Sequence, residues 1–361
     1  MKNGKIYCRK CISFSNENPI VLKQPSLCNP IYQISYKLTD EQFYISSLVL
    51  NNYINRKNSL VYAVCGAGKT EITFEIISYA LKNRKTVGFA IPRKDVVIEL
   101  SKRLQDVFKG AKVIAVYGGN TNDLEGDIIV LTTHQIYRYI NFFDLLIMDE
   151  IDAFPYKGND TLHEFVKRSI SGNYLLMSAT PSKELIESFD SNSVFKLQKR
   201  FHNHPIPVPQ IVELPSFLFI FFLLKKIKQY KKEGKQLLIF VPTIDNGELL
   251  YFKLRYLVKK IELVHSQRKN RNEIINDFRN KKYDVLVTTS VLERGITIPN
   301  LQVIIFNADN NIFNSAALIQ ISGRVGRKKD YPDGEVIFLC KVKNHEMEDA
   351  IKITKENNSV L

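Results

Sequence analysis

At 361 residues the chain is longer than one ordinary hydrophobic core supports and suits two domains of typical size. Its longest apolar run, residues 217–224 (FLFIFFLL), is far shorter than the roughly 20 residues of a membrane-spanning helix. Lys and Arg total 51 against 37 Asp and Glu, and this net charge of +14 favours a polyanionic partner, nucleic acid first and an anionic membrane surface second. The N-terminal segment lacks the apolar core of a secretory signal, so we expect a cytosolic protein with reduced cysteines.

Residues 1–35 form a short head that carries Cys8, Cys11 and Cys28. Apolar runs without polar alternation follow, separated by helical patterns, as is typical of parallel strands buried on both faces. We expect a first domain over 36–205, an extended linker over 206–216, where prolines break the pattern, and a second domain over 217–361. The strands are predicted at 60–64, 86–91, 113–116, 128–131, 145–148 and 174–177, then at 237–241, 261–264, 285–288, 303–306 and 336–339. The predicted fold class is α/β, with two tandem domains.

Residues 63–70 (AVCGAGKT) follow the first predicted strand and open a helical pattern. They match the Walker phosphate-loop pattern except at Ala63, which replaces its first glycine. Gly66 and Gly68 let successive backbone N–H groups face phosphates at a helix N-terminus. Lys69 would reach the β- and γ-phosphates of ATP, and Thr70 would join the Mg²⁺ shell. The candidate ATP-binding residues here are Cys65, Gly66, Ala67, Gly68, Lys69 and Thr70. The alternative is a glycine-rich turn before a helix.

A second carboxylate element follows the predicted strand 145–148. Asp149 suits the Mg²⁺ shell and Glu150 suits polarising the attacking water, although two acids could instead begin a solvated loop. Together with the phosphate loop, these acids predict ATP hydrolysis.

Three motifs in order, DEID at 149–152, SAT at 178–180 and QISGRVGR at 320–327, resemble the superfamily 2 helicases and translocases over residues 36–340. The resemblance implies two RecA-like domains. Gln320, Arg324 and Arg327 of the second domain would then act in catalysis, because an arginine supplied on domain closure stabilises phosphoryl transfer and ties hydrolysis to motion. Ser178, Ala179 and Thr180 would couple the acid box to the linker. The alternative for the arginines is an ordinary surface turn.

Further stretches match the nucleic-acid and coupling motifs of that superfamily. Such groups touch phosphates along a groove without reading bases, which implies sequence-independent binding of single strands, although each threonine alone could be a helix cap. Gly295 joins the ATP-binding set. The candidate nucleic-acid residues are Pro92, Arg93, Thr132, Thr133, Thr288 and Thr289.

Residues 38–42 (LTDEQ) resemble the element with which related translocases recognise adenine, and Gln42 would bond the base edge. Thr39 and Gln42 also fit a capping box at a helix start. The two interpretations are compatible.

The head (YCRKCISF at 7–14), LTDEQ, DEIDAFP at 149–155 and QISGRVGR together resemble the ComFA family, the late-competence ATPases of naturally transformable Gram-positive bacteria. The resemblance covers essentially the full chain. It implies a cytosolic ATPase, peripheral at the inner face of the membrane, that pulls single-stranded DNA through an uptake channel. It also implies three kinds of partner: the channel protein, the companion phosphoribosyltransferase-like protein of the same operon and single-strand handling proteins.

The head departs from the family pattern at one position. Two CxxC pairs usually form a four-cysteine zinc site, but Ile31 occupies the place of the fourth cysteine. Structural Zn²⁺ takes four ligands, so either Cys8, Cys11 and Cys28 bind it with a further ligand such as Glu17 or the head is metal-free.

Three rival functions share parts of this pattern. A replication-restart or repair helicase would carry the same motor residues. A nucleotide switch could clamp DNA on ATP binding without turnover. A membrane-surface adaptor could use the basic excess, although no amphipathic basic helix stands out.

Overall fold

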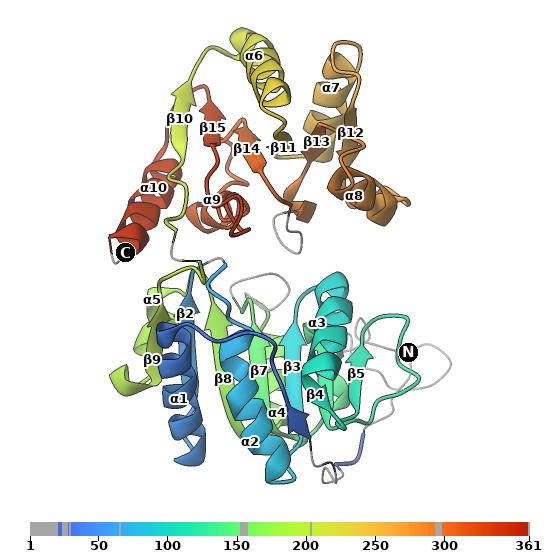
Figure 1. The fold of residues 1–361 in the computed structure, drawn as a ribbon, viewed down its shortest axis with the longest axis vertical. Helices are drawn as coiled ribbons and strands as arrows, with labels where there is room; N and C mark the ends of the chain where they lie inside the picture. The colour runs from blue at the N-terminus through green and yellow to red at the C-terminus, as the bar shows by residue number, and fades with distance from the viewer. Residues whose placement is uncertain are drawn as a thin grey trace, which may run out of the picture. The chain divides into compact units, whose positions relative to one another are not determined.

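The computed structural model describes residues 21–23, 28, 30–64, 66–151, 158–202, 204–292 and 298–359 (Figure 1). These residues divide into two compact units. The first comprises the described part of 1–63 together with Gly68–Leu197, and the second comprises Val64–Ala67 together with Gln198–Leu361. Each unit is built on its own sheet. No helix in the described ranges is long and apolar enough to cross a membrane.

The first unit contains a seven-stranded sheet in the order β5-β6-β3-β7-β8-β2-β9, and every neighbouring pair is parallel. Its strands are β2 (Ser59–Ala63), β3 (Val87–Ile91), β5 (Val113–Val116), β6 (Ile128–Thr132), β7 (Phe143–Asp149), β8 (Ile170–Ser178) and β9 (Val194–Leu197). Central strands such as β3 and β6 are buried at every residue. Unbroken apolar runs were therefore a sound signal for strands covered on both faces.

Helices connect these strands. They are α1 (Asp40–Ile54), α2 (Phe74–Lys82), α3 (Lys94–Val107), α4 (Asp160–Ser169) and α5 (Lys183–Glu187). The helix after the phosphate loop begins with a 3₁₀ turn, Glu71–Thr73, and a longer 3₁₀ segment, Thr133–Arg138, follows β6. A short antiparallel pair, β1 (Ile31–Tyr32) with β4 (Phe108–Lys109), lies outside the large sheet.

The second unit contains a six-stranded parallel sheet in the order β10-β15-β14-β11-β13-β12. Its strands are β10 (Gln210–Glu213), β11 (Gln236–Phe240), β12 (Ile261–Val264), β13 (Val285–Thr288), β14 (Leu301–Phe306) and β15 (Val336–Cys340). Its helices are α6 (Phe219–Lys232), α7 (Ile244–Leu254), α8 (Arg271–Arg279), α9 (Ser315–Ser322) and α10 (His345–Asn358). The apolar run 217–224 continues from a 3₁₀ turn, Ser216–Leu218, into α6.

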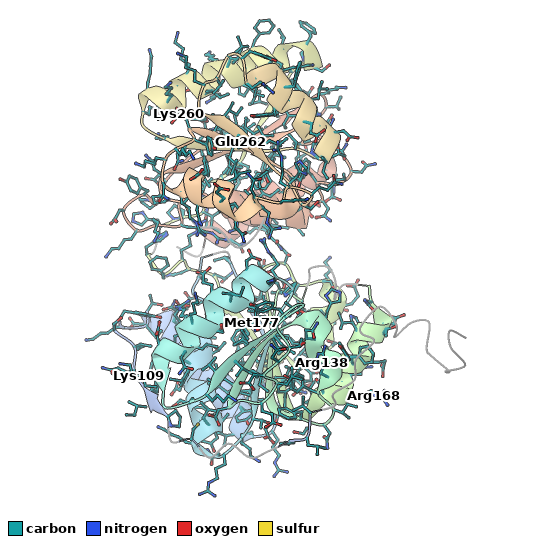
Figure 2. All side chains as sticks on the ribbon, turned by 90° about the vertical axis from the view of Figure 1, so that its right-hand side faces the viewer. Lys109, Arg138, Arg168, Met177, Lys260 and Glu262 are labelled. Atoms are coloured by element: carbon teal, nitrogen blue, oxygen red, sulfur yellow. The ribbon has the colours of Figure 1, made fainter. Side chains whose placement is uncertain are left out.

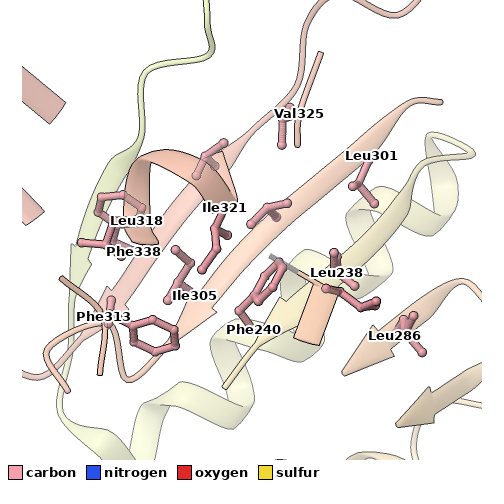
Figure 3. Packing of buried hydrophobic residues seen from close by; sticks show 14 of the residues in the cluster. Leu238, Phe240, Leu286, Leu301, Ile305, Phe313, Leu318, Ile321, Val325 and Phe338 are labelled. Atoms are coloured by element: carbon pink, nitrogen blue, oxygen red, sulfur yellow. The ribbon is translucent and has the colours of Figure 1, made fainter. Parts of the chain in front are cut away.

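Successive residues of these strands enter two different apolar layers. Leu238 and Phe240 pack with residues of α8, α9 and α10, whereas Leu237 and Ile239 pack with α6 and α7. Figure 3 shows the first layer, in which Ile321 and Val325 from the end of α9 meet the sheet. Figure 2 shows side chains filling each interior, such as Met177, while exposed lysines such as Lys109 and Lys260 extend outward. Parallel strands accept this arrangement because helices cover both faces of the sheet.

The two parallel-sheet α/β domains are confirmed, and the predicted strands are all present. The division between the units lies at Leu197–Gln198 rather than at 205. The expected linker 206–216 contains the strand β10, which pairs with β15 at one edge of the second sheet. Pro207 and Pro209 precede β10 and Pro215 follows it, so they remove no hydrogen bond from the strand itself, and an edge position tolerates them nearby. Strand β9 also escaped prediction, because its four residues include an exposed lysine.

Candidate functional site

The phosphate loop leaves the end of β2. Gly66 and Gly68 both have left-handed backbones, with φ of 83° and 81°. This conformation is costly for residues with a Cβ, so glycine suits both positions, and left-handed residues of this kind are one element of an anion-binding nest. Between them, the Ala67 N–H donates to the Val64 carbonyl at 3.2 Å. Cys65 lies outside the described residues, and Ala67 is buried. The two predicted glycines therefore adopt left-handed conformations, and phosphate binding at this loop stays a prediction.

Lys69 and the acid box come together at the carboxyl edge of the first sheet. Lys69 Nζ lies 3.7 Å from Asp149 Oδ1, and both side chains are largely buried, with 16% and 17% exposed. Asp149 Oδ1 also accepts a hydrogen bond from the backbone N–H of Glu150, at 2.9 Å. Thr70 begins the 3₁₀ turn, where its carbonyl accepts a hydrogen bond from the Thr73 hydroxyl at 2.7 Å. Residues far apart in sequence thus supply a cation and a carboxylate to one place.

Glu150 has φ of 58°, an unusual backbone conformation for a residue with a side chain. Such conformations cost about 1–2 kcal/mol, and acidic residues tolerate them better when a local hydrogen bond compensates. Here the bond from its own N–H to Asp149 does so. Residues held in such conformations often cluster at functional sites. No sequence signal announced this conformation.

Gln42 lies beside the phosphate loop. A Cβ placed on Gly68 would lie 2.2 Å from Gln42 Nε2, so the amide would have to move to admit any larger residue. Gln42 Oε1 accepts a hydrogen bond from the Thr39 N–H at 2.9 Å, and the Thr39 hydroxyl accepts one from the Gln42 N–H at 3.2 Å. The predicted capping box at the start of α1 is confirmed. Its second effect is to hold the Gln42 side chain against the loop.

An ion pair next to the phosphate loop could not be predicted from the sequence. Arg103 of α3 forms an ion pair with Glu71, the residue after Thr70, and donates a hydrogen bond to the Tyr36 hydroxyl at 3.0 Å. Burial disfavours the charge of Arg103, but the contact with Glu71 outweighs it and raises the pKa of the guanidinium. Neither Glu71 nor Arg103 belongs to a sequence motif from which this ion pair could be predicted.

The remaining motifs of the first unit follow strands of the same sheet. Ser178 ends β8, pairs in register with Tyr62 of β2 and accepts a hydrogen bond from the Thr180 N–H at 3.0 Å; Ala179 between them is buried. Pro92 and Arg93 follow β3. The guanidinium of Arg93 contacts Asp95 through two nitrogens, at 2.7 and 3.2 Å.

Thr132 ends β6, where it is in register with Ile91 of β3, and Thr133 follows it directly. Both threonines are buried. Burial lowers the pKa of His134 beside them and so favours its neutral form. The motif order along the sheet edge therefore runs from β6 and β3, the proposed nucleic-acid side, to β7, β8 and β2, the proposed nucleotide side.

In the second unit, Thr288 ends β13 and donates a hydrogen bond to the carbonyl of Thr289 at 3.1 Å; both are buried. Gln320 lies in α9 and is buried, as is Arg324 just beyond it. Arg327 is partly exposed, and its Nε donates a hydrogen bond to the Gly323 carbonyl at 2.8 Å. Gly295 lies outside the described residues.

Of the three predicted zinc ligands, the structure describes only Cys28. Cys8 and Cys11 lie outside the described ranges, and Cys28 is half-buried. Within the described ranges no group of three metal-ligating side chains gathers. The zinc site stays a prediction from the head alone.

Comparison with known proteins identifies close relatives of the whole chain. A family model described as "Helicase conserved C-terminal domain" matches residues 220–329, and one described as "Type III restriction enzyme, res subunit" matches residues 35–183. The competence protein ComFA of Bacillus subtilis is 34% identical over 99% of this chain and 81% of its own length. ComFA of Streptococcus pneumoniae is 34% identical over 97% of this chain and 85% of its own length.

A solved structure of Dbp5 from S. cerevisiae, bound to RNA and ADP BeF3, shares the fold. It matches 90% of this chain and 88% of its own with a TM-score of 0.68, at 18% sequence identity. That likeness supports two RecA-like domains.

Proposed function

Because the chain belongs to the ComFA family and is a helicase-like ATPase of superfamily 2, we propose that it couples ATP hydrolysis to movement along single-stranded DNA during DNA uptake. The contact between Lys69 and Asp149 carries this proposal. It brings a lysine and an aspartate together at one sheet edge, beside a loop with two left-handed glycines, and such a cation and carboxylate suit contacts with phosphate and with a metal ion.

Each residue of the site then has a distinct role. The loop amides around Gly66 and Gly68 bind the phosphates, and Lys69 leaves Asp149 to contact the β- and γ-phosphates. Glu150 orients and deprotonates the attacking water. Gln42, held beside Gly68 by the capping box, contacts the adenine edge.

Thr70 and Asp149 would hold Mg²⁺, and the donor set fits, since hydroxyl and carboxylate oxygens are the ligands that Mg²⁺ prefers. When bound, the ion would neutralise charge on the phosphate oxygens. Its proposed ligand Asp149 already lies beside Lys69, a cation that can shift to the phosphates as the ion arrives.

The second unit contributes Gln320, Arg324 and Arg327, which we assign to stabilising the charge that develops on the γ-phosphoryl group. Support comes from their place within residues 220–329, which the helicase C-terminal model matches. If these arginines contact the γ-phosphate during only part of the hydrolytic cycle, then ATP turnover would drive movement of the second domain.

The proposed DNA contacts need one refinement. Thr132, Thr133, Thr288 and Thr289 are buried, so their hydroxyls are poor candidates to reach a strand. Backbone groups of these segments, together with Pro92 and Arg93, are the better contacts for a sugar-phosphate chain. Such binding is independent of sequence and weakens as salt rises.

Phosphate release from ATP, with and without single-stranded DNA, tests the proposal. We expect DNA to stimulate turnover, Lys69→Ala to abolish it, and Lys102→Ala, which removes an exposed lysine of the same unit, to leave it intact. Absence of turnover with ATP-responsive DNA binding would instead support a switch. Turnover without DNA stimulation would leave an ATPase with another partner.

Displacement of streptavidin from biotinylated single strands tests movement itself. Release that depends on ATP supports a translocase, whereas activity confined to unwinding of forked duplexes would support a replication-restart or repair helicase. The uptake-channel protein, the companion phosphoribosyltransferase-like protein and peripheral attachment at the inner membrane face remain parts of the proposal. Cell fractionation and co-purification with each partner would check them.

A further inference from the structure

The turn after α9 carries the proposed arginines and is held from within. The N–H groups of Gly323, Arg324 and Val325 donate to the carbonyls of Ile319, Ile321 and Ser322, at 2.9, 3.0 and 3.2 Å. Val325 is fully buried in the apolar layer that Figure 3 shows. The helix end is thus anchored on its apolar side, while the carbonyls of Val325 and Gly326 need a partner of their own.

Arg200 supplies that partner from a distant segment. Its side chain is almost fully buried, with 1% exposed, and its Nη1 donates to the Val325 carbonyl at 3.0 Å and to the Gly326 carbonyl at 2.8 Å. Hydrogen bonds from a charged donor are about twice as strong as neutral ones. These two carbonyls belong to the residues just before Arg327, which lie 125 and 126 positions after Arg200 in the sequence.

His202 adds a third bond to the same turn. The His204 N–H donates to His202 Nδ1 at 3.2 Å, so Nδ1 is the acceptor and the ring proton lies on Nε2. Nε2 then donates to the Gly326 carbonyl at 3.0 Å. Burial lowers the pKa of His202, which favours this neutral form. Two side chains therefore converge on one carbonyl.

Gly326 makes this convergence possible. Its φ is 68°, and a Cβ at this position would lie 2.0 Å from the Pro332 carbonyl oxygen and 2.9 Å from Arg200 Nη1. Only glycine fits between these groups. The backbone just before Arg327 is therefore enclosed by Pro332 on one side and Arg200 on another.

From this enclosure we propose that Arg200, assisted by His202, is a positioning residue that fixes the backbone from which Arg327 acts. The proposal rests on the proposed function, in which Arg327 stabilises phosphoryl transfer. A displacement of about 1 Å in a catalytic group can cost about 100-fold in rate, so a clamp at the two preceding carbonyls matters for turnover rather than for ATP binding.

The kinetic test compares Arg200→Ala, Arg200→Lys and Lys199→Ala, the last removing the neighbouring cation. We expect Arg200→Ala to lower kcat for DNA-stimulated hydrolysis about 100-fold, with KM for ATP changed less than about 3-fold. Arg200→Lys should recover part of the rate, because its ammonium can reach one carbonyl. Lys199→Ala should match the parent protein.

A double-mutant cycle with Arg327→Ala assigns the effect. If Arg200 acts through Arg327, then Arg200→Ala costs less than about 3-fold in kcat once Arg327 is removed. An undiminished loss in that background, or an unchanged kcat in the single variant, would overturn the proposal.

Hydrogen exchange separates this proposal from the proposed function. In nucleotide-free protein, Arg200→Ala should speed exchange of the amides of 323–327, whereas Lys199→Ala should not. Unchanged exchange in the turn refutes the clamp even if hydrolysis falls. Faster exchange confined to the turn, in a parent protein without ATPase activity, would uphold the clamp and refute the proposed function instead.

Discussion

Strand β7 carries one aspartate near its start and another at its end, and the two have different surroundings. Asp144 accepts hydrogen bonds from Lys23 Nζ at 2.8 Å, from the Thr86 N–H at 2.9 Å and from the Thr86 hydroxyl at 3.0 Å. Asp149 meets Lys69 at 3.7 Å, beyond direct hydrogen-bond distance. Their exposed fractions are similar, 13% and 17%, so burial does not distinguish them.

The difference lies in what their partners can do next. Lys23 and Thr86 satisfy Asp144 and tie β7 to neighbouring segments, because Lys23 also donates to Ser171 at 2.8 Å. Lys69 belongs to the predicted phosphate loop, and we propose that it exchanges Asp149 for a phosphate when ATP binds. The hydrogen bonds that Asp144 accepts from a lysine and a threonine tie segments of the fold together, whereas Asp149 lies at a strand's carboxyl end, the edge at which α/β sheets bind ligands.

The largest expected contrast comes from Asp149→Asn. This change keeps the side-chain size but removes the charge proposed for the Mg²⁺ shell, so we expect kcat for ATP hydrolysis to fall at least about 100-fold. The free energy of unfolding should change little, because the pair with Lys69 is loose. Phosphate release and urea unfolding measure the two effects. A large loss of stability without a loss of turnover would reverse the comparison.

Asp144→Asn should show the opposite pattern. Removing this carboxylate leaves the ammonium of Lys23 without its anion, and we expect a loss of roughly 1–3 kcal/mol in the free energy of unfolding. ATP hydrolysis by the folded protein should stay within about 3-fold of the parent, because the site is at the other end of the strand. A cycle with Lys23→Ala checks that the loss belongs to this pair: the two changes together should cost less than their sum.

Gly68→Ala tests how tightly the site end is packed. The added Cβ would meet Gln42 Nε2 at 2.2 Å and would also strain a backbone with φ of 81°. Gly119→Ala is the matched control, since Gly119 has φ of 87° and open space around its Cβ position. We expect about 10-fold weaker ATP binding for Gly68→Ala and no change for Gly119→Ala, measured by calorimetry. Equal ATP affinity in both variants would show that the position of the Gln42 side chain beside Gly68 does not matter for ATP binding.

Sequence patterns predicted the strands and the phosphate loop, but they did not predict the tertiary contacts that hold these elements in place. Apolar runs located the sheets because both faces of each are covered, and the loop motif located two left-handed glycines. The prolines before Gln210 concealed the edge strand β10, since a break in the pattern resembles a linker. Arg200 carried no signal at all, because its partners are backbone carbonyls more than a hundred residues away. Contacts of that kind depend on the folded chain and not on local spacing.

The smallest expected effect is the pH dependence of the stabilisation that Asp144 contributes to the free energy of unfolding. Burial raises the pKa of Asp144, but the hydrogen bonds from Lys23 and Thr86 outweigh it and the pKa lies below the ordinary value. In the unfolded chain this carboxyl protonates near pH 3.9, while the folded protein keeps it ionised to lower pH. The unfolded state therefore binds more protons in that interval, and the stability from Asp144 is complete above about pH 5 and is lost as pH falls through the folded pKa.

Urea unfolding of the parent and Asp144→Asn proteins at about pH 7, 5 and 3.5 measures this dependence. The difference between them should be the same at the first two values and smaller at the third. A difference that already narrows between about pH 7 and 5 would assign the loss to a histidine instead, because only a group titrating near 6.5 changes charge there. Asp149→Asn, whose pair is loose, should show a much smaller difference from the parent at each pH. If it instead tracked Asp144→Asn, both ends of β7 would be structural and the contrast between them would fail.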